Sequence, residues 1–293
     1  MRIFLTGATG SIGSAVLENL IAHGHEVTCI VRSEAKAAEI SNKGGIPLIF
    51  TINPETAYQI ADLCIGFDAI IHTAFTFSED GIKSEHIITD AMISGARKTA
   101  ETKPVSLLST SGCVINGNTN WIIDEDHDDT SQCLPSFAFR PILERKVCNA
   151  TCGNLRAAVI RPVWVYGRSF VEDWILACKK HNKIIAVNGN PHICFIHYED
   201  LADMYRILVE NKATGLFYAS EPESMTLETI IERLSQSINV QDVERVSEPW
   251  SIRETYGVFP VAHTQDQQMV SKRFRDLYGY TPSHNFLKWL SSF

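Results

Sequence analysis

The sequence lacks an excess of positive charge. It carries 26 Lys and Arg against 34 Asp and Glu, which gives a formal net charge of −8. Proteins that bind nucleic acid or an anionic membrane surface usually carry a basic patch or a positive charge balance. We therefore expect neither nucleic acid nor a membrane as a partner of this chain.

Long apolar runs and targeting signals are also missing. No run of about 18 apolar residues suggests a membrane-spanning helix. A short apolar run follows Arg2, but it passes into TGATGSIG without the small-residue cleavage site of a signal peptide. These features predict a cytoplasmic protein, which we expect to be a monomer or a homodimer.

The eight cysteines contain no C-x-x-C pair. Cys148 and Cys152 lie four residues apart on a predicted helix, a spacing that suits packing better than a disulfide. Reduced thiols are typical of a protein in a reducing compartment. No spacing typical of zinc ligands is visible, so no metal site is predicted.

What the chain does contain is an alternation of strand and helix patterns. Apolar strands are predicted at 2–7, 25–32, 45–50, 67–75, 105–111 and 155–162, and helices at 14–24 and 33–44. Strands separated by helices pair in parallel through right-handed crossovers. The predicted fold is α/β, a Rossmann doubly wound parallel sheet with a smaller C-terminal substrate-binding region.

The expected boundary between the two regions follows Pro162. Residues 1–165 are predicted to form the dinucleotide-binding domain, and 166–293 mainly the substrate region, with some segments returning to the sheet. Helices are expected in the smaller region within 164–183, 197–211 and 225–238. The acidic segment from 112 to 135 is expected to be a loop, and no Gly/Ser/Pro-rich linker separates the halves.

The segment TGATGSIG places Gly7, Gly10 and Gly13 between a strand and a helix. In this context the first glycine permits a tight turn, the second admits the pyrophosphate, and the third lets helix and strand pack closely. The helix N-terminus then receives the negative charge of the pyrophosphate. The loop therefore predicts a dinucleotide site; glycines that serve a tight turn alone are the alternative.

The second strand ends on Arg32, followed by Ser33, where an NAD-binding protein usually has an acidic residue for the ribose 2′-hydroxyl. A cation and a hydroxyl suit a 2′-phosphate, so NADP is the expected cofactor, with NAD possible. The alternative is that Arg32 is a solvated surface residue.

TGATGSIG, HTA at 72–74, STSG at 109–112, RPVWVYG at 161–167 and HYEDLADMY at 197–205 together resemble the extended and atypical short-chain dehydrogenase/reductases, including epimerase/dehydratase-like members. The resemblance implies a Rossmann fold, a nicotinamide cofactor and a small-molecule substrate. By its pattern, Ser111 matches the serine that binds a substrate oxygen. The expected cofactor-binding residues are Thr6, Gly7, Thr9, Gly10, Ser11, Ile12, Gly13, Arg32, Ser33, Thr73, Ala74, Ser109, Arg140, Pro162 and Val163.

The family's Y-x-x-x-K acid is absent. None of the eight tyrosines has a lysine four residues later. If Glu144 takes the place of a glutamate that often follows this motif, Arg140 stands at the lysine position and Ser136 at the tyrosine position. The chain resembles an atypical subgroup with an R-x-x-x-E helix. Arginine stays charged near neutral pH and cannot donate the proton.

The expected catalytic residues are Ser111, Arg140 and Tyr166. Other candidate donors are Thr110, His72 and His197, each of which could instead be a structural residue. Arg140 is expected to point into the cleft and contact cofactor or substrate; an exposed ion pair with Glu144 is the alternative. Phe75 and Phe77 could line an apolar substrate pocket or pack in the core.

Three functions remain open for this scaffold. The first is an NADP(H)-dependent oxidoreductase acting on a small carbonyl or alcohol, with an unusual proton donor or water. The second is a non-redox isomerase, lyase or cyclase that retains the cofactor site. The third is a protein that binds NADP(H) and senses it.

Overall fold

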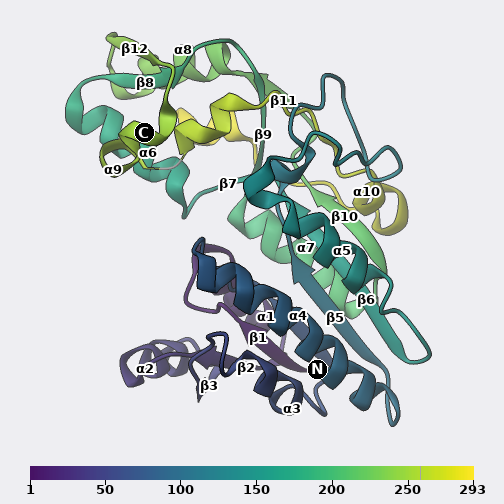
Figure 1. Cartoon of the computed structure of the whole chain (residues 1–293). Coiled ribbons are helices and arrows are strands. Elements are labelled where there is room, and N and C mark those ends of the chain that lie inside the picture. The colour runs from purple at the N-terminus through teal and green to yellow at the C-terminus, as the bar shows by residue number, and fades with distance from the viewer. Residues whose placement is uncertain (258) are drawn as a thin grey trace. The chain divides into compact units, whose positions relative to one another are not determined.

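A computed structural model describes residues 1–257 and 259–293 (Figure 1). The chain forms two compact units whose segments alternate along the sequence. The first unit comprises residues 1–111, 138–161 and 201–217, and the second comprises residues 112–137, 162–200 and 218–293. In the part of the chain that is described, no helix combines the length and the apolarity needed to cross a membrane.

A seven-stranded sheet forms the centre of the first unit, in the order β10-β6-β5-β4-β1-β2-β3. The neighbouring pairs from β6 to β3 are all parallel. This order, in which the chain works outward from β1 in both directions, confirms the predicted doubly wound Rossmann sheet. The strands are β1 (Arg2–Thr6), β2 (Glu26–Val31), β3 (Ile46–Ile49), β4 (Ala69–His72), β5 (Val105–Thr110), β6 (Leu155–Pro162) and β10 (Gly215–Ala219).

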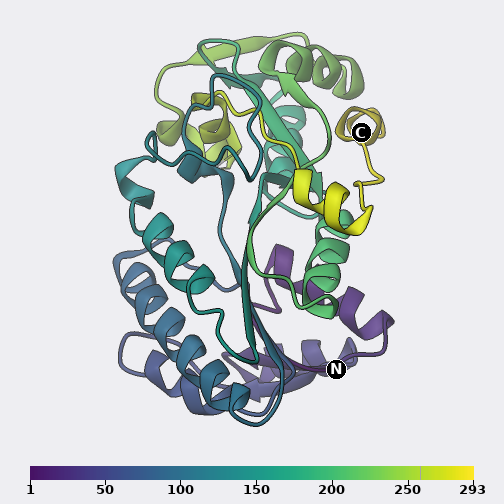
Figure 2. The same cartoon turned by 90° about the vertical axis from the view of Figure 1, so that its right-hand side faces the viewer.

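Helices cover both faces of this sheet. Figure 2 shows α4 and α5 along one face, and α1 and α7 along the other. Asn19 of α1 donates a hydrogen bond to Asp203 of α7 at 3.0 Å, and α7 belongs to the first unit from Leu201 onward, whereas its first turn belongs to the second unit. The helices are α1 (Ser11–Ala22), α2 (Glu34–Asn42), α3 (Ile60–Leu63), α4 (Glu79–Ala100), α5 (Phe139–Cys148) and α7 (Tyr198–Glu210).

The sequence patterns did not predict the longest of these helices, α4. Ser78 caps it by accepting a hydrogen bond from the backbone N–H of Gly81 at 3.0 Å. The buried face of α4 includes Ile88 and Met92, but one turn before Ile88 it carries Glu85, a buried carboxylate. A charged group at such a position needs a partner inside the protein.

The second unit has two small sheets, ordered β11-β9-β7 and β12-β8. Its strands are β7 (Trp164–Tyr166), β8 (Ile184–Val187), β9 (His192–His197), β11 (Ser224–Thr226) and β12 (Val243–Val246). Its helices are α6 (Phe170–His181), α8 (Leu227–Ile238), α9 (Arg253–Tyr256), α10 (Lys272–Tyr278) and α11 (Phe286–Leu290). The predicted loop from 112 to 135 contains the short 3₁₀ helix Cys113–Asn116, and a second 3₁₀ helix, Pro135–Phe137, begins at its end.

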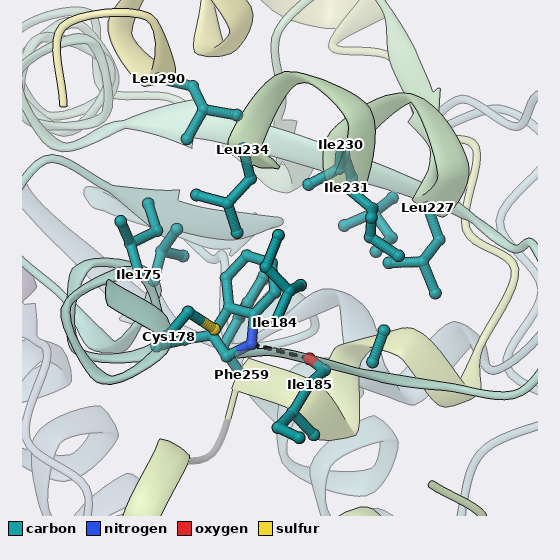
Figure 3. Packing of buried hydrophobic residues seen from close by; sticks show 14 of the residues in the cluster. Ile175, Cys178, Ile184, Ile185, Leu227, Ile230, Ile231, Leu234, Phe259 and Leu290 are labelled. Atoms are coloured by element: carbon teal, nitrogen blue, oxygen red, sulfur yellow. Dashed lines mark hydrogen bonds between the residues drawn. The ribbon is translucent and has the colours of Figure 1, made fainter. Parts of the chain in front are cut away.

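An apolar core of its own holds this second unit together (Figure 3). One face of α8, with Leu227, Ile230 and Leu234, is fully buried in it. These residues recur at helical spacing, which aligns them on one face. The indole Nε1 of Trp174 in α6 donates to the carbonyl oxygen of Ile185 at 2.9 Å and so ties α6 to β8.

Candidate functional site

The glycine loop between β1 and α1 brings three backbone segments into close contact. Gly7 has φ +79°, and a Cβ there would lie 2.6 Å from the backbone nitrogen of Ala74. A Cβ at Gly13 would lie 2.1 Å from the carbonyl oxygen of Gly7. Any larger residue at either position would push the strand, the loop and the helix apart, so both glycines are required by the packing.

Gly10 has a different role. It is the N-cap of α1, and a Cβ there would meet one neighbouring heavy atom, the Gly7 carbonyl oxygen, at 3.3 Å. A glycine cap has no side chain that could occupy the first N–H groups of the helix. These donors and the positive end of the helix dipole suit an anion such as a pyrophosphate. The glycine loop thus fits a dinucleotide on physical grounds.

A cavity of about 700 Å³ opens beside this loop, within the first unit. Six of the predicted cofactor residues line it: Gly7, Thr9, Gly10, Arg32, Thr73 and Ala74. Its other walls come from Ile30, Val31, Lys36, Phe50, Ile52, Asn53, Pro54, Glu55, Phe75, Thr76, Ser78, Asp80, Gly81, Ser84, Glu85 and Ile88. The lining does not include Thr6, Ser11, Ile12, Gly13, Ser33, Ser109, Arg140, Pro162 or Val163.

The predicted cofactor residues that do not line the cavity lie within strands, at the start of a helix, or in the second unit. Thr6 and Ser109 are buried in β1 and β5, and Ser11 and Ile12 begin α1. Pro162 ends β6, and the backbone N–H of Val163 donates to the carbonyl oxygen of Ala219 at 3.1 Å. Both belong to the second unit.

Two cations line the cavity, Arg32 and Lys36. Arg32 directly follows β2 and is exposed, and it forms no ion pair within residues 1–257 and 259–293. Lys36, which the sequence reading missed, lines the same cavity from α2. Ser33 is the N-cap of α2 and accepts from the backbone N–H of Lys36 at 3.4 Å. Two cations beside a helix N-terminus suit an additional phosphate.

A buried chain of polar side chains runs from β1 to α5. The Oγ1 of Thr6 lies 2.6 Å from Nδ1 of His72, and Nε2 of His72 lies 3.2 Å from Oε2 of Glu85. The other carboxylate oxygen of Glu85 accepts from a guanidinium nitrogen of Arg140 at 2.7 Å. Sequence reasoning missed Glu85, because a glutamate within a helix is normally assigned to the solvent side.

The pKa of Glu85 reflects this arrangement. Burial by itself raises the pKa of the carboxyl, but the nearby His72 and Arg140 outweigh burial and leave the pKa below its ordinary value. Glu85 is therefore an anion at neutral pH. It holds the guanidinium of Arg140 in one place.

Arg140 also contacts the end of β5. The same guanidinium nitrogen donates to the carbonyl oxygen of Thr110 at 3.2 Å, and the guanidinium carbon lies 4.1 Å from the ring centroid of Phe75. The alternative of an exposed pair with Glu144 is wrong, because Glu144 forms a buried ion pair with Arg161 and Arg140 pairs with Glu85. Phe75 and Phe77 are exposed rather than in the core, and Phe75 lines the cavity.

Ser111 follows β5 directly. Its Oγ is buried and has no hydrogen-bond partner among the described residues. The adjacent Thr110 hydroxyl is engaged, since its Oγ1 lies 2.6 Å from the His72 carbonyl oxygen and 2.5 Å from the Tyr205 hydroxyl. A buried hydroxyl without a partner costs free energy unless a ligand supplies one. Ser111 therefore fits a group that binds a substrate oxygen.

The remaining candidates lie in the second unit or at the surface. Tyr166 in β7 is fully buried, and its hydroxyl donates to Oε1 of Glu221 at 2.5 Å. Burial and the neighbouring carboxylate raise the pKa of Tyr166, so it holds its proton firmly. Burial, followed by the nearby His284, lowers the pKa of His197 to about 4. Ser136 is exposed in the 3₁₀ helix Pro135–Phe137, just before α5.

The sequence matches a family profile and resembles individual proteins along most of its length. Residues 3–218 match the profile of the NAD dependent epimerase/dehydratase family. An uncharacterized protein of Schizosaccharomyces pombe is 26% identical over 98% of this chain and 97% of its own length. A decarboxylating sterol-4-alpha-carboxylate 3-dehydrogenase of Dictyostelium discoideum is 22% identical over 76% of this chain and 72% of its own.

Solved structures share the fold. A dTDP-glucose 4,6-dehydratase from Bacillus anthracis, in complex with NAD, aligns over 100% of this chain and 94% of its own, with TM-score 0.79 and 12% identity. A human epimerase family protein solved with NADPH aligns over 100% of this chain and 98% of its own, with TM-score 0.73 and 19% identity. At these identities the likeness establishes the fold.

Proposed function

The chain belongs to the NAD-dependent epimerase/dehydratase family, and we propose that it is an NADP(H)-dependent oxidoreductase that acts on a small carbonyl or alcohol. The observation that carries the proposal is the buried, unpartnered hydroxyl of Ser111, next in sequence to the carbonyl that Arg140 contacts. The dehydrogenase relative supports redox chemistry in the family.

The glycine loop, Arg32 and Lys36 are assigned to cofactor binding. The N-terminus of α1 would receive the pyrophosphate, and the two cations would receive the 2′-phosphate that distinguishes NADP from NAD. The apolar Phe50 and Ile52, which line the same cavity after β3, would contact the adenine. When bound, the nicotinamide supplies or accepts the hydride.

Ser111 and Arg140 are assigned to the substrate oxygen. Ser111 would donate a hydrogen bond to this oxygen and hold it in position. Arg140, fixed by Glu85 and Thr110, would provide a preorganised positive charge for the negative charge that develops there. Arginine keeps its proton, so we propose that the transferred proton comes from water rather than from Arg140 or the buried Tyr166.

A non-redox isomerase, lyase or cyclase is the second candidate. One observation favours it: the position that the family gives to its acid is Ser136, which is exposed here. A site that polarises a carbonyl but lacks a positioned acid can still catalyse rearrangements that need orientation and charge stabilisation.

The experiment is to mix the protein with NADPH and a panel of small aldehydes and ketones, and to follow loss of NADPH absorbance. We expect turnover with at least one carbonyl. Ser111→Ala should lower kcat by about 10²-fold or more, in line with loss of one hydrogen bond to a developing oxyanion. Ser136→Ala is the matched control, since it removes an exposed serine hydroxyl and should leave kcat unchanged.

The outcomes separate the candidate functions. Tight NADPH binding without NADPH loss, together with a substrate converted to a product of unchanged mass, would refute the redox proposal and support an isomerase. Tight binding with no product of any kind would leave a binding or sensing protein. Equal loss of activity in both serine variants would overturn the role given to Ser111.

A further inference from the structure

Three potential metal ligands converge within the second unit, and none of them is among the residues assigned above to the cofactor or the substrate. Among the residues that the structure describes, His197, Glu199 and His284 are the one group of three or more His, Cys, Asp or Glu whose ligand atoms all lie within 4.8 Å of one another. They come from the end of β9, the first turn of α7, and the segment before α11. Sequence spacing predicted no metal site because His284 lies far from the other two along the chain.

We propose that His197, Glu199 and His284 bind a divalent zinc ion. The geometry supports this assignment. Oε2 of Glu199 lies 3.2 Å from Nε2 of His284 and 3.8 Å from Nδ1 of His197. Zinc ligands at 2.0–2.2 Å in a tetrahedron lie roughly 3.3–3.5 Å apart. The two observed separations bracket this value. The rings of His197 and His284 are stacked, with 3.8 Å between centroids and 21° between their planes, so one imidazole must turn to direct its lone pair at the ion.

A second layer of hydrogen bonds already orients His284. Its Nδ1 lies 3.0 Å from Oδ2 of the buried Asp200, which leaves Nε2 directed toward Glu199. Zinc-binding histidines commonly use their other ring nitrogen to donate to a carboxylate in this way. Asp200 also accepts from the backbone N–H groups of Ser283 and His284, so the backbone that carries this ligand is fixed.

The other two ligands differ in how freely they can adjust. His197 is buried, and its Nδ1 accepts a long hydrogen bond of 3.4 Å from the backbone N–H of Glu199, which a metal bond would replace. The Glu199 side chain is 55% exposed, and its other oxygen, Oε1, accepts from the Tyr198 hydroxyl at 2.9 Å. An exposed carboxylate can rotate onto the metal and leaves a fourth position open to water.

Two features bear on the choice of occupant, the charge of the surroundings and the types of ligand atom. Arg168 lies over the Tyr198 ring with its guanidinium carbon 4.5 Å from the centroid, so the surroundings are not purely acidic. Two imidazoles with one carboxylate favour a borderline cation such as zinc over magnesium or calcium, which prefer oxygen ligands alone. The ion would tie the segment before α11 to the β9–α7 turn.

The test uses the full chain, stripped of metal with a chelator and dialysed. Zn²⁺ alone is titrated against a chromophoric zinc chelator as competitor. We expect one zinc per chain, with affinity reduced at least tenfold in Glu199→Gln and at least a hundredfold in His284→Asn. His127→Asn is the matched control, because His127 also pairs with a carboxylate, Asp124 at 2.7 Å, but has no second histidine.

Co²⁺ provides an independent readout of geometry. Bound at this site it should give the strong visible absorption of a four-coordinate ion, and Glu199→Gln should weaken or shift that absorption. Glu199 is exposed, so its substitution should preserve the fold even if His284→Asn does not. Absence of stoichiometric zinc binding, or an equal zinc affinity in the wild type and Glu199→Gln, would overturn the proposal.

Discussion

Arg140→Ala should destabilise the protein by about 3–5 kcal/mol, because it leaves the Glu85 carboxylate buried without its guanidinium partner. The Glu85 side chain is 3% exposed and the Arg140 side chain is 11% exposed, so both charges are largely removed from bulk water. An exposed helix pair would contribute only ~0.3–0.5 kcal/mol. The loss in the free energy of unfolding is therefore nearly an order of magnitude larger if Arg140 forms a buried pair with Glu85 than if it forms an exposed helix pair.

Three contacts contribute to this magnitude. The substitution removes the hydrogen bond to Glu85 at 2.7 Å, the hydrogen bond to the Thr110 carbonyl oxygen at 3.2 Å, and the cation–π contact with Phe75 at 4.1 Å. The cation–π contact alone is worth about 0.5–2 kcal/mol. His72 remains beside Glu85 and limits the loss, since its Nε2 lies 3.2 Å from the carboxylate.

Urea denaturation at neutral pH gives the measurement, with the change in the free energy of unfolding taken from the midpoint. Arg206→Ala is the matched control. Arg206 also has two carboxylate partners, Asp203 at 3.0 Å and Glu210 at 2.9 Å, but this group is more exposed, with side-chain exposures of 20% for Arg206 and 34% for each carboxylate. We expect its replacement to cost less than about 1 kcal/mol.

A double variant separates stability from function. Glu85→Gln with Arg140→Met removes both charges and should recover much of the stability that Arg140→Ala loses, because no buried charge remains unpaired. Its NADPH-dependent activity should stay low, since the fixed cation is gone. A cost below about 1 kcal/mol for Arg140→Ala would refute the buried-pair reasoning. Full activity in the double variant would refute the catalytic role of Arg140.

Three further predictions concern the cofactor and pH. Gly10→Val should abolish dinucleotide binding in a fluorescence titration while the circular dichroism spectrum stays unchanged; unchanged affinity would remove the cofactor assignment. Arg32→Asp should lower the NADP-to-NAD affinity ratio at least about tenfold, roughly 1.4 kcal/mol, and Lys36→Ala should lower it less; an unchanged ratio would make Arg32 a bystander. Burial raises the pKa of Glu221 from its ordinary 4.5 to about 7, so the contribution of this group to stability is fully present below pH 4.5 and is lost as pH rises through 7, by up to roughly 3 kcal/mol. Urea midpoints at pH 5 and pH 8 should therefore differ less in Glu221→Gln than in the wild type, and an equal difference would contradict the burial argument.

Local sequence patterns predict much of the dinucleotide-binding sheet. The strand predicted at 155–162 is β6 with the same bounds, and the strand predicted at 2–7 is β1 to within one residue. Short apolar runs bounded by glycine and polar residues specify buried parallel strands, because both faces of such a strand are covered. The glycine spacing also identified Gly7 and Gly13, whose close backbone contacts tolerate no side chain.

The helix α4 escaped prediction because its pattern contains polar residues on the buried side. Glu85, Ser84 and Thr89 are all buried there. A local reading assigns such residues to solvent, and the apolar stripe then becomes too weak to identify. The buried polar groups are stable only because partners from other elements reach them, and Glu85 meets His72 from β4 and Arg140 from α5.

The sequence alone determined the family resemblance, the glycine loop and the absence of a Y-x-x-x-K acid, because each depends on residues close together in the chain. The tertiary structure alone decided the partner of Arg140. Glu144, one helical turn away, was the local candidate, but the buried Arg161 takes it, and Glu85 is brought to Arg140 from a distant helix. Buried charges pair with the opposite charge that the packing places beside them. The distance between two side chains in space cannot be read from their separation along the sequence.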